Sequence, residues 1–476
     1  MEFEAVIGLE IHVEMKTRSK MFSSSPVEFG AEPNTLTSVY DLAFPGVLPV
    51  VNKEAVRNAI RVSHALHMKI DQELHFDRKN YFYSDLPKGY QITQNERPIG
   101  SEGYLDFDIN GEIHRVEIER LHMEEDTCKQ LHFASCTLVD YNRAGVPLIE
   151  IVTKPCIHNA EVAAKYVETI REIVVYTDVS DGKMEEGSLR CDVNVSIREK
   201  GSTTLGNKVE IKNINSINYV KNAIEFEIKR QIELYQKGET IIQETRRYDE
   251  KNEATLPMRV KTDAVDYKYF PEPNITPIVL SDEFVEDAIN TCPELASSIR
   301  NRFINEFGLT SYDTEVLLAN RDLVKYFNKC IDHTKYYKVT ANWIIVDIQA
   351  YLNKEAITIY NFPISPKRLA DLVNMIESKE ISNKQGREIF TYMLTHDVTA
   401  SEGKKELGIS SQISDEDTIR ALVNEVLDAN AQSIVDFKAG KDRALGFMIG
   451  QVMRKSGGKV NPSLTNKIML EEIGRR

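Results

Sequence analysis

The sequence has few cysteines, no long apolar run and no basic leader. Its 476 residues include six cysteines, which are far apart and form no C-x-x-C pair. Such spacing fits neither a zinc site nor a secreted disulfide framework, so we expect reduced thiols. No apolar run approaches the roughly 18–20 residues that span a bilayer, and the N-terminus MEFEAVIGLE is acidic where a signal peptide is basic. We therefore predict a cytoplasmic protein with no membrane partner.

Several catalytic motifs and an excess of basic charge are also missing. The sequence contains no G-x-x-x-x-G-K-[ST], G-x-G-x-x-G or G-x-S-x-G, so any nucleotide binds without a P-loop or a Rossmann turn. A serine nucleophile is not expected, because the run SSS (23–25) has no base beside it. The 59 basic and 73 acidic residues give a net charge of −14, which argues against a protein whose whole surface coats nucleic acid.

The remaining composition is that of a globular protein, and its length predicts roughly three domains of about 150 residues. The sequence pattern of residues 1–292 predicts an α+β domain. A helix is expected at about 216–237, and period-2 alternation of apolar residues predicts strands at 6–15, 103–109, 188–198 and 208–214.

Beyond residue 292 the apolar residues recur at intervals of three and four residues, which predicts helices. We expect an all-α domain at 293–406 and a smaller all-α tail at 407–476, with 401–414 as the linker. Three helix starts are indicated by capping residues: Ser365 before Pro366, Ser414 with Asp417, and Asn461 before Pro462.

The strand at 6–15 carries the first candidate site residues. Alternation places Ile7, Leu9, Ile11 and Val13 on a core face and Glu10, His12 and Glu14 on the other. Carboxylates flanking an imidazole suit a divalent metal, although a solvated strand face would have the same pattern.

Two further acidic positions are candidates. Glu124, Glu125 and Asp126 follow one another beside His122, either as metal ligands or as a solvated turn. Glu150 lies in the apolar stretch PLIEIV (147–152). A buried carboxylate there requires a cation or a metal, whereas a position on an exposed edge strand requires neither.

Polar residues also alternate on the strands at 188–198 and 208–214, which suits the floor of a polar cleft. This row contains Arg190, Asp192 and Glu210, and FDRKNYFY (76–83) adds Lys79 beside aromatic residues. Carboxylates that hold metal ions, together with Lys or Arg that neutralise developing charge, are what phosphoryl transfer requires.

The tail is basic, unlike the chain as a whole. Residues 437–476 contain nine basic and three acidic residues. They form either a phosphate-binding surface or a solvated helix face. Ala439, Gly446 and Gly450 are small enough to let helices approach closely. The candidate phosphate-binding residues are Lys438, Lys441, Arg443, Arg454, Lys455 and Lys459.

Long motifs, in order along nearly the whole chain, resemble the B subunit of the tRNA-dependent amidotransferases, the GatB family. They are VIGLEIHVEMKTRSKMFS, FDRKNYFYSDLPKGYQITQ, RLHMEEDTCK, NRAGVPLIEIVTKP, KMEEGSLRCDVNVSIR, KNINSINYV, QETRRYDE and DYKYFPEPN.

The resemblance implies an antiparallel-sheet cradle similar to the glutamine synthetase and guanido kinase fold, followed by helical domains of which the last helps to recognise tRNA. It implies an ATP- and Mg²⁺-dependent ligase that phosphorylates the side-chain carboxylate of Glu on tRNA(Gln), or Asp on tRNA(Asn), and amidates it. The ammonia would come from the glutaminase of the complex, its A subunit, and the C subunit would complete the heterotrimer.

The resemblance also implies roles for individual residues. Glu10, His12, Glu125 and Lys79 would be catalytic, and Arg190, Asp192 and Glu210 would contact ATP or the acyl phosphate. Metal liganding would fall to Glu10, His12, Glu124, Glu125 and Glu150, and tRNA binding to the six basic residues of the tail named above.

The chain departs from the family pattern at three places. Some members hold zinc with cysteines near residues 20–45, where this chain has none, so no zinc is expected. Cys156 stands at the usual Asp, and MRVK (258–261) replaces M-R-S-K. Two alternatives remain: a stand-alone Mg²⁺-dependent kinase or ligase, which leaves the basic tail unexplained, and a non-catalytic tRNA-binding scaffold, which leaves the carboxylates unexplained.

Overall fold

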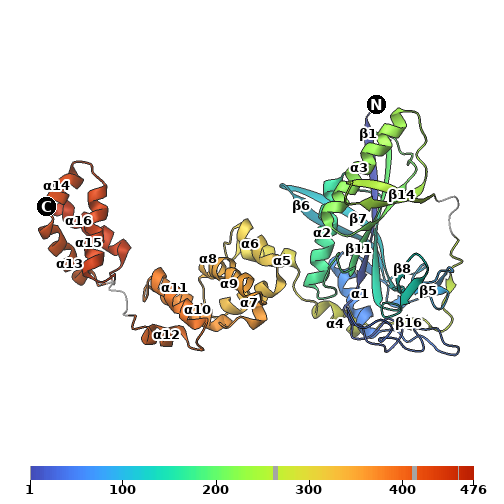
Figure 1. Ribbon diagram of the computed structural model, residues 1–476, viewed down its shortest axis with the longest axis horizontal. Coiled ribbons are helices and arrows are strands. Elements are labelled where there is room, and N and C mark those ends of the chain that lie inside the picture. Colours follow the sequence, from blue (N-terminus) through green and yellow to red (C-terminus); the bar gives the residue numbers. More distant parts are fainter. Residues whose placement is uncertain (1, 261–265, 410–414, 459) are drawn as a thin grey trace. The chain divides into compact units, whose positions relative to one another are not determined.

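The computed structural model describes residues 2–260, 266–409, 415–458 and 460–476. The chain divides into two compact units, Met1–Ala296 and Ser297–Arg476. The first unit combines a large sheet with helices, and the described elements of the second are all helices (Figure 1). The prediction of an α+β part followed by a helical part is therefore confirmed.

A nine-stranded sheet dominates the first unit, in the order β14-β13-β12-β11-β1-β10-β7-β6-β2. Neighbouring strands are antiparallel except β12 and β13, which are parallel. The prediction of a purely antiparallel sheet is thus wrong at this pair, because helix α3 crosses over between the two strands and returns the chain in the same direction. The strands are β1 (Phe3–Glu14), β2 (Lys69–Ile70), β6 (Gly100–Ile109), β7 (Glu112–Glu125), β10 (Pro147–Thr153), β11 (Leu189–Glu199), β12 (Val209–Ile214), β13 (Glu244–Asp249) and β14 (Ala254–Val260).

Shorter strands form three small sheets beside the large one. Their orders are β15-β4-β5, β16-β3 and β8-β9. The strands are β3 (Glu73–Leu74), β4 (Asp77–Asn80), β5 (Tyr90–Thr93), β8 (Lys129–His132), β9 (Thr137–Asp140), β15 (Phe270–Pro271) and β16 (Ile278–Val279).

The two faces of the large sheet differ in character. Ile7, Leu9, Ile11 and Val13 of β1 are fully buried, as their alternation predicts. They share one hydrophobic core with helices that cover this face (Figure 1). The opposite face of β1 carries the polar side chains and is where the candidate site lies. The helices of this unit are α1 (Lys53–Ala65), α2 (Ala160–Tyr176), α3 (Ile217–Gln236) and α4 (Asp282–Asn290).

The helices of the second unit begin mostly where capping residues predict. Ser365 and Asn461 cap α10 and α16, each with proline in the first turn. Helix α13 is capped by Asp415, not by the predicted Ser414, which lies outside the described residues. The helices are α5 (Ala296–Asn305), α6 (Ser311–Leu318), α7 (Arg321–Ile331), α8 (Tyr337–Asn342), the π-helix η1 (Trp343–Ile348), α9 (Gln349–Glu355), the 3₁₀ turn η2 (Ile359–Asn361), α10 (Pro366–Glu377), α11 (Asn383–Met393), α12 (Ala400–Glu406), α13 (Glu416–Ala429), α14 (Ala431–Lys438), α15 (Arg443–Lys455) and α16 (Pro462–Arg475).

Two details of the helical region differ from expectation. The first part of the expected linker is helix α12, because Thr399 and Glu402 form a capping box. Gly446 and Gly450 of α15 are exposed, and a Cβ at either would meet no atom of the described residues within 4 Å. Neither glycine therefore lies at a close contact with another described helix. Helices α13–α16 nevertheless share a core of their own, built from residues such as Ile419, Met448 and Ile468.

No helix within the described ranges is both long and apolar enough to cross a membrane.

Candidate functional site

Strand register brings the candidate residues together on the open face of the sheet. His12 of β1 pairs with Glu150 of β10 on one side and with Arg190 of β11 on the other. Glu150 pairs in turn with His122 of β7. Four strands thus place two imidazoles, a carboxylate and a guanidinium in one row. Two members of this row, His12 and Arg190, are more than 170 residues apart in the sequence.

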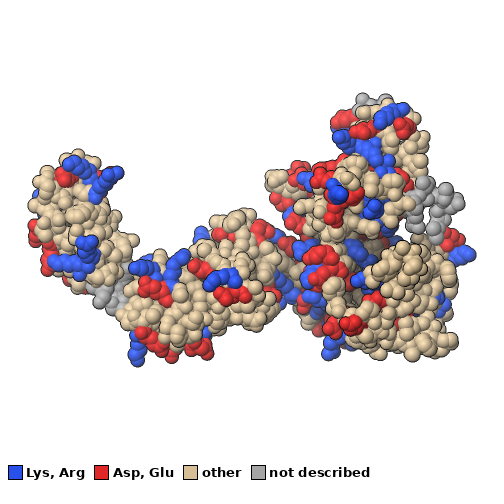
Figure 2. Space-filling view, viewed as in Figure 1, with Lys and Arg blue, Asp and Glu red and all other residues tan. Residues whose placement is uncertain are grey.

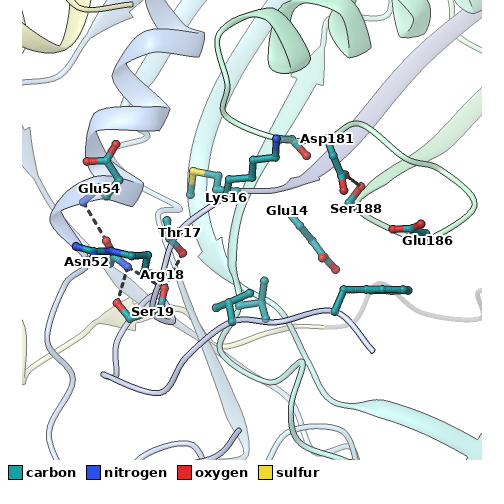
Figure 3. Close-up of a pocket in the computed structure, with 15 residues that line it drawn as sticks. Glu14, Lys16, Thr17, Arg18, Ser19, Asn52, Glu54, Asp181, Glu186 and Ser188 are labelled. Atoms are coloured by element: carbon teal, nitrogen blue, oxygen red, sulfur yellow. Dashed lines mark hydrogen bonds between the residues drawn. The ribbon is translucent and has the colours of Figure 1, made fainter. Parts of the chain in front are cut away.

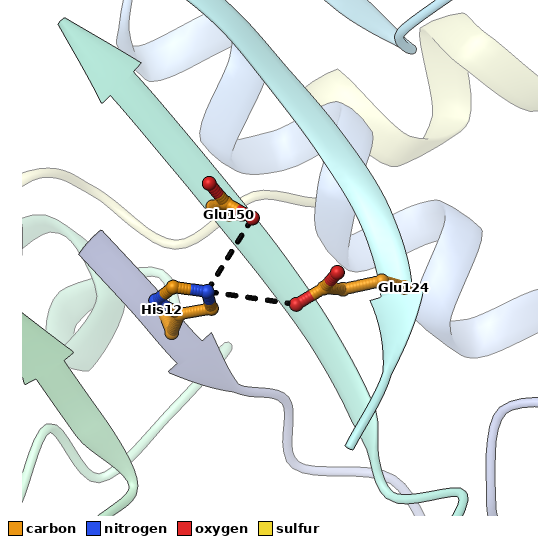
Figure 4. A group of neighbouring side chains, drawn as sticks. All are labelled: His12, Glu124 and Glu150. Atoms are coloured by element: carbon orange, nitrogen blue, oxygen red, sulfur yellow. Dashed lines mark ion pairs between the residues drawn. The ribbon is translucent and has the colours of Figure 1, made fainter. Parts of the chain in front are cut away.

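The first group of donors is formed by His12, Glu124 and Glu150 (Figure 4). Nε2 of His12 lies 3.4 Å from Oε2 of Glu150 and 3.6 Å from Oε1 of Glu124. His122 joins the group, since its Nε2 lies 3.2 Å from the same Glu150 oxygen. Glu124 and Glu150 are buried, which excludes the solvated turn and the exposed edge strand that the sequence left open.

The charges of this group depend on one another. Burial opposes the charged imidazole of His12, but the carboxylates of Glu150 and Glu124 outweigh it and raise the pKa of His12 to about 9. Burial opposes the charged carboxylate of Glu150, yet His122 and His12 hold its pKa well below the usual range. Without a metal, protonated imidazole therefore neutralises the carboxylates.

A second group lies beside the first and consists of Glu10, Asp192 and Glu210. Glu10 pairs with Asp192 across β1 and β11. Burial, with the nearby Glu150 and Asp192, raises the pKa of Glu10. Nζ of Lys212 neutralises the group at 2.6 Å from Asp192 and 3.3 Å from Glu210.

Both groups offer donors that suit divalent cations. In each group, one ligand atom per residue lies within 4.8 Å of the others. The second group is all carboxylate, the donor set that Mg²⁺ prefers. The first group adds imidazole, which suits Fe²⁺, Ni²⁺ or Zn²⁺, to carboxylates, which also suit Mn²⁺. Nδ1 of His122 is buried and has no hydrogen-bond partner among the described residues.

Glu125 does not join either group. Its carboxylate is buried, lies 2.6 Å from Nζ of Lys88 and accepts a hydrogen bond from the backbone N–H of Ile92. The prediction that Glu125 is a metal ligand alongside Glu124 conflicts with this geometry, because consecutive residues of a strand point to opposite faces.

Lys79 lies on β4, next to the first group. The carboxylates of Glu124 and Glu150 raise its pKa against the opposing effect of burial. Its ammonium also lies 4.9 Å from the ring centroid of Tyr267, a cation–π contact. Lys79 is therefore a charged group beside the carboxylates.

Arg190 connects the row to a third acidic pair. Its guanidinium donates to Asp126 at 2.8 Å. Burial and the adjacent Asp126 raise the pKa of Glu14 to about 8. Burial opposes charge on Asp126, but Arg190 and Arg143 lower its pKa. The proton of this pair accordingly resides on Glu14.

Glu14 also borders a cavity of about 690 Å³ at the end of β1 (Figure 3). Lys16, Asp181 and Ser188 lie around the same space, and Ser188 donates to Asp181.

The predicted tRNA-binding cations of the tail are exposed where the structure describes them, and Lys459 lies outside the described residues. Lys441 pairs with Asp436 and Lys455 with Glu425. Figure 2 shows acidic side chains beside the basic ones on these helices. Among the described residues, three of the predicted cations form no ion pair, namely Lys438, Arg443 and Arg454.

The sequence alone assigns no role to three residues of the site. His122 is identifiable there only as a neighbour of the acidic run, although its period-2 spacing from Glu124 places both on one face. Lys212 is identifiable on the strand at 208–214, but without a partner. No local sequence pattern identifies Lys88 as a site residue, because its carboxylate partner, Glu125, is 37 residues away in the sequence.

A sheet whose open face holds two groups of carboxylate and imidazole donors is characteristic of enzymes that bind divalent cations. Residues 5–286 match the family described as the GatB/GatE catalytic domain, and residues 325–473 match the GatB domain. The B subunit of the aspartyl/glutamyl-tRNA(Asn/Gln) amidotransferase of Lysinibacillus sphaericus (strain C3-41) is 48% identical over the full length of both chains. The protein of the same name from Staphylococcus aureus (strain JH9) is also 48% identical over both full lengths. The chain belongs to the GatB family.

Proposed function

We propose that this chain is the B subunit of a tRNA-dependent amidotransferase. It would use ATP to phosphorylate the side-chain carboxylate of Glu on tRNA(Gln), or of Asp on tRNA(Asn), and then direct ammonia to the activated carbonyl. The names of the relatives support this proposal. The observation that carries it is the pair of adjacent carboxylate groups, flanked by Lys79 and Arg190, on one open sheet face.

The chemistry explains why such a site is needed. A carboxylate oxygen is a poor leaving group, and phosphorylation converts it into a good one. Two anions, the carboxylate and the triphosphate, must first approach each other, which costs Coulomb energy. Lys79 and Arg190 would reduce this repulsion, and they remain charged because neighbouring carboxylates raise the pKa of each against burial.

Magnesium would supply further charge neutralisation when bound to the phosphates. The residues that would hold it are those of the second group, Glu10, Asp192 and Glu210, with His12, Glu124 and Glu150 as the other candidate set. We propose that Glu125 acts with Lys88 and not as a metal ligand, because its carboxylate is already bound there.

We further propose that the first unit is a cradle of the glutamine synthetase and guanido kinase type. One face of its sheet is covered by helices and the other holds the polar site, which supports the idea. The tail would bind tRNA, the glutaminase (the A subunit) would provide ammonia, and the C subunit would complete the complex. A separate glutaminase is required because the sequence contains no amidase signature of its own.

An ammonium-dependent assay tests the proposal. This chain is co-expressed with the A and C subunits and supplied with Glu-tRNA(Gln), ATP, Mg²⁺ and ammonium chloride, but no glutamine. We expect Gln-tRNA from wild type and at least a tenfold lower rate from Glu150→Gln, because Glu150 contacts both imidazoles. Glu112→Gln, a change at an exposed residue of β7, is the matched control.

The alternatives predict different outcomes. Equal rates in wild type and Glu150→Gln would favour a non-catalytic tRNA-binding scaffold. ATP-dependent turnover of free glutamate by this chain alone would favour a stand-alone kinase or ligase.

A further inference from the structure

Thr245 of β13 contacts the second group of donors (Glu10, Asp192 and Glu210) from a strand that carries none of its members. The hydroxyl of Thr245 donates a hydrogen bond to Oε2 of Glu210 at 2.9 Å. Thr245 is 2% exposed and Glu210 is 9% exposed, so the bond is buried. Threonine is common in strands, and the surroundings of this pair therefore decide whether the contact has a role in the site.

The parallel pairing of β12 with β13 produces the contact. Helix α3 connects the two strands, and their register places Thr245 directly opposite Glu210. Side chains opposite each other on neighbouring strands share one face of the sheet. The crossover through α3 therefore adds a fifth strand to the four that line the open face around His12.

The neighbours of Thr245 in the sequence fasten β13 to helix α3. Glu244 and Arg246 point toward the helix, and Nη1 of Arg246 lies 2.6 Å from Glu244. Nη2 of Arg230 on α3 lies 3.2 Å from the same oxygen of Glu244. Glu227, which is fully buried on α3, lies 2.6 Å from Arg230 and 3.6 Å from Arg246. This network of paired charges fixes β13, and with it the position of the Thr245 hydroxyl.

A cation in the second group would disturb its contact with Lys212 more than its contact with Thr245. Nζ of Lys212 lies 3.3 Å from Oε1 of Glu210 and 2.6 Å from Oδ2 of Asp192. An ammonium group this close to a divalent cation is repelled by it. Thr245 is uncharged and donates to the other oxygen of Glu210, so its hydrogen bond is compatible with a bound cation. Carboxylates that ligate metals depend on hydrogen bonds of this kind for their orientation.

We propose that Thr245 is a positioning residue of the second group, which holds Oε2 of Glu210 so that Oε1 is directed at the divalent cation. The inference rests on the proposed function, which assigns Mg²⁺ to this group. The donors fit that ion, because three carboxylates offer oxygens within 4.8 Å of one another. Without the hydroxyl, Glu210 loses a fixed orientation but remains present. Cation affinity should therefore fall although no ligand atom has been removed.

Magnesium binding to the full chain tests the role of the hydroxyl. Isothermal titration calorimetry with Mg²⁺ is performed on Glu124→Gln as the parent chain, which lacks a ligand of the first group, so that the titration reports the second group. We expect Thr245→Val in this parent to lower Mg²⁺ affinity about tenfold, as for other hydrogen-bond partners of ligating groups. Thr245→Ser should stay within about twofold of the parent, because serine offers the same hydroxyl donor.

Thr255 of β14 provides a matched control. It is also 2% exposed, and its hydroxyl also donates to a buried glutamate at 2.9 Å, but this glutamate is Glu227 of helix α3. Thr255→Val therefore removes the same kind of bond away from the cation site. Valine suits a strand, so both valine variants should fold. We expect Thr255→Val to lower the Tm and to leave Mg²⁺ affinity unchanged.

Each contrary outcome identifies what has failed. Parent-like Mg²⁺ affinity in Thr245→Val would overturn the inference and leave the proposed function intact. Equal losses of affinity in Thr245→Val and Thr255→Val would also overturn it, because the loss would then come from general destabilisation. The same holds if Thr245→Ser loses as much affinity as Thr245→Val, since the hydroxyl would not be what matters. If the Glu124→Gln parent binds no Mg²⁺, the second group is not a cation site, and the inference fails together with that part of the proposed function.

Discussion

Glu124 and Glu125 are consecutive residues of β7, and their carboxylates lie on opposite faces of the sheet. Glu124 contacts His12 at 3.6 Å, and Glu125 contacts Lys88 at 2.6 Å. The strand pleat causes this separation. The two neighbouring acids therefore have different partners. Glu124 contacts imidazole on the open face of the sheet, and Glu125 contacts an ammonium group on the opposite face.

This separation predicts different responses to the same substitution. In Glu124→Gln we expect Mn²⁺ affinity, measured by calorimetry on the full chain, to fall at least tenfold, because a ligand oxygen is replaced by an amide. In Glu125→Gln we expect Mn²⁺ affinity within about twofold of wild type. The thermal stability of Glu125→Gln should fall instead, since Lys88 loses its buried partner. An equal loss of Mn²⁺ affinity in both variants would show that the faces are not independent.

Lys20 and Asp41 form a buried ion pair in the loop region that follows β1. Their charged atoms are 3.3 Å apart, and both side chains are essentially inaccessible to solvent. Asp41 also accepts a hydrogen bond from Ser25, and Lys20 donates to the carbonyl of Tyr141. This network fastens the segment in which some family members are expected to hold zinc.

Breaking this pair should destabilise the first unit. Asp41→Asn leaves the Lys20 ammonium buried without a counter-charge, which costs about 3–5 kcal/mol. We expect a lower Tm by differential scanning calorimetry. Adding Lys20→Met to Asp41→Asn should recover part of the loss, because the uncompensated charge is then gone. If the double variant is less stable than Asp41→Asn alone, the charge is not the cause.

The tail should bind tRNA mainly through its unpaired cations. Lys438, Arg443 and Arg454 form no ion pair among the described residues, whereas Lys441 and Lys455 do. Changing the three unpaired residues to Gln should weaken tRNA binding. It should also reduce the slope of log affinity against log salt by roughly one for each phosphate that the variant no longer neutralises.

The salt dependence is measured by filter binding or fluorescence anisotropy from low to moderate salt. Gln in place of Lys200, Lys237 and Lys251, three exposed lysines of the first unit, makes the same charge change elsewhere and should leave the slope nearly unchanged. An unchanged slope in the tail variant would mean that the basic residues form only a solvated helix face.

Much of the fold could be predicted because it depends on local patterns. The alternation of Ile7, Leu9, Ile11 and Val13 determines which face of β1 is buried, whatever packs against it. The N-caps Ser365 and Asn461 are local in the same sense. The parallel pairing of β12 with β13 could not be predicted in this way, because it depends on where the chain goes after helix α3.

The site can be predicted less completely from the sequence, because its geometry comes from strand register. Glu10, His12 and Glu150 belong to two strands, and only the pairing of β1 with β10 and β11 places them beside one another and beside Asp192. The phase of β7 relative to β10 decides that Glu124 and not Glu125 faces His12. The motif EED (124–126) alone does not indicate which of its acids faces His12, because that depends on the register of distant strands.

Glu14 gives the site a dependence on pH that stability measurements can detect. Burial and Asp126 raise its pKa from 4.5 to about 8 in the folded chain. Between these values the folded state binds more protons than the unfolded state, so the stabilising contribution is complete below about pH 4.5 and is lost as pH rises through about 8. Glu14→Gln removes this titration. We therefore expect the Tm of Glu14→Gln minus that of wild type to increase from pH 5 to about pH 8 and to level off by pH 9. Glu112→Gln, at an exposed carboxylate, should show no such trend. A difference between Glu14→Gln and wild type that stays constant over this range would mean that Glu14 is ionised throughout, and that Arg190 neutralises both acids of the pair.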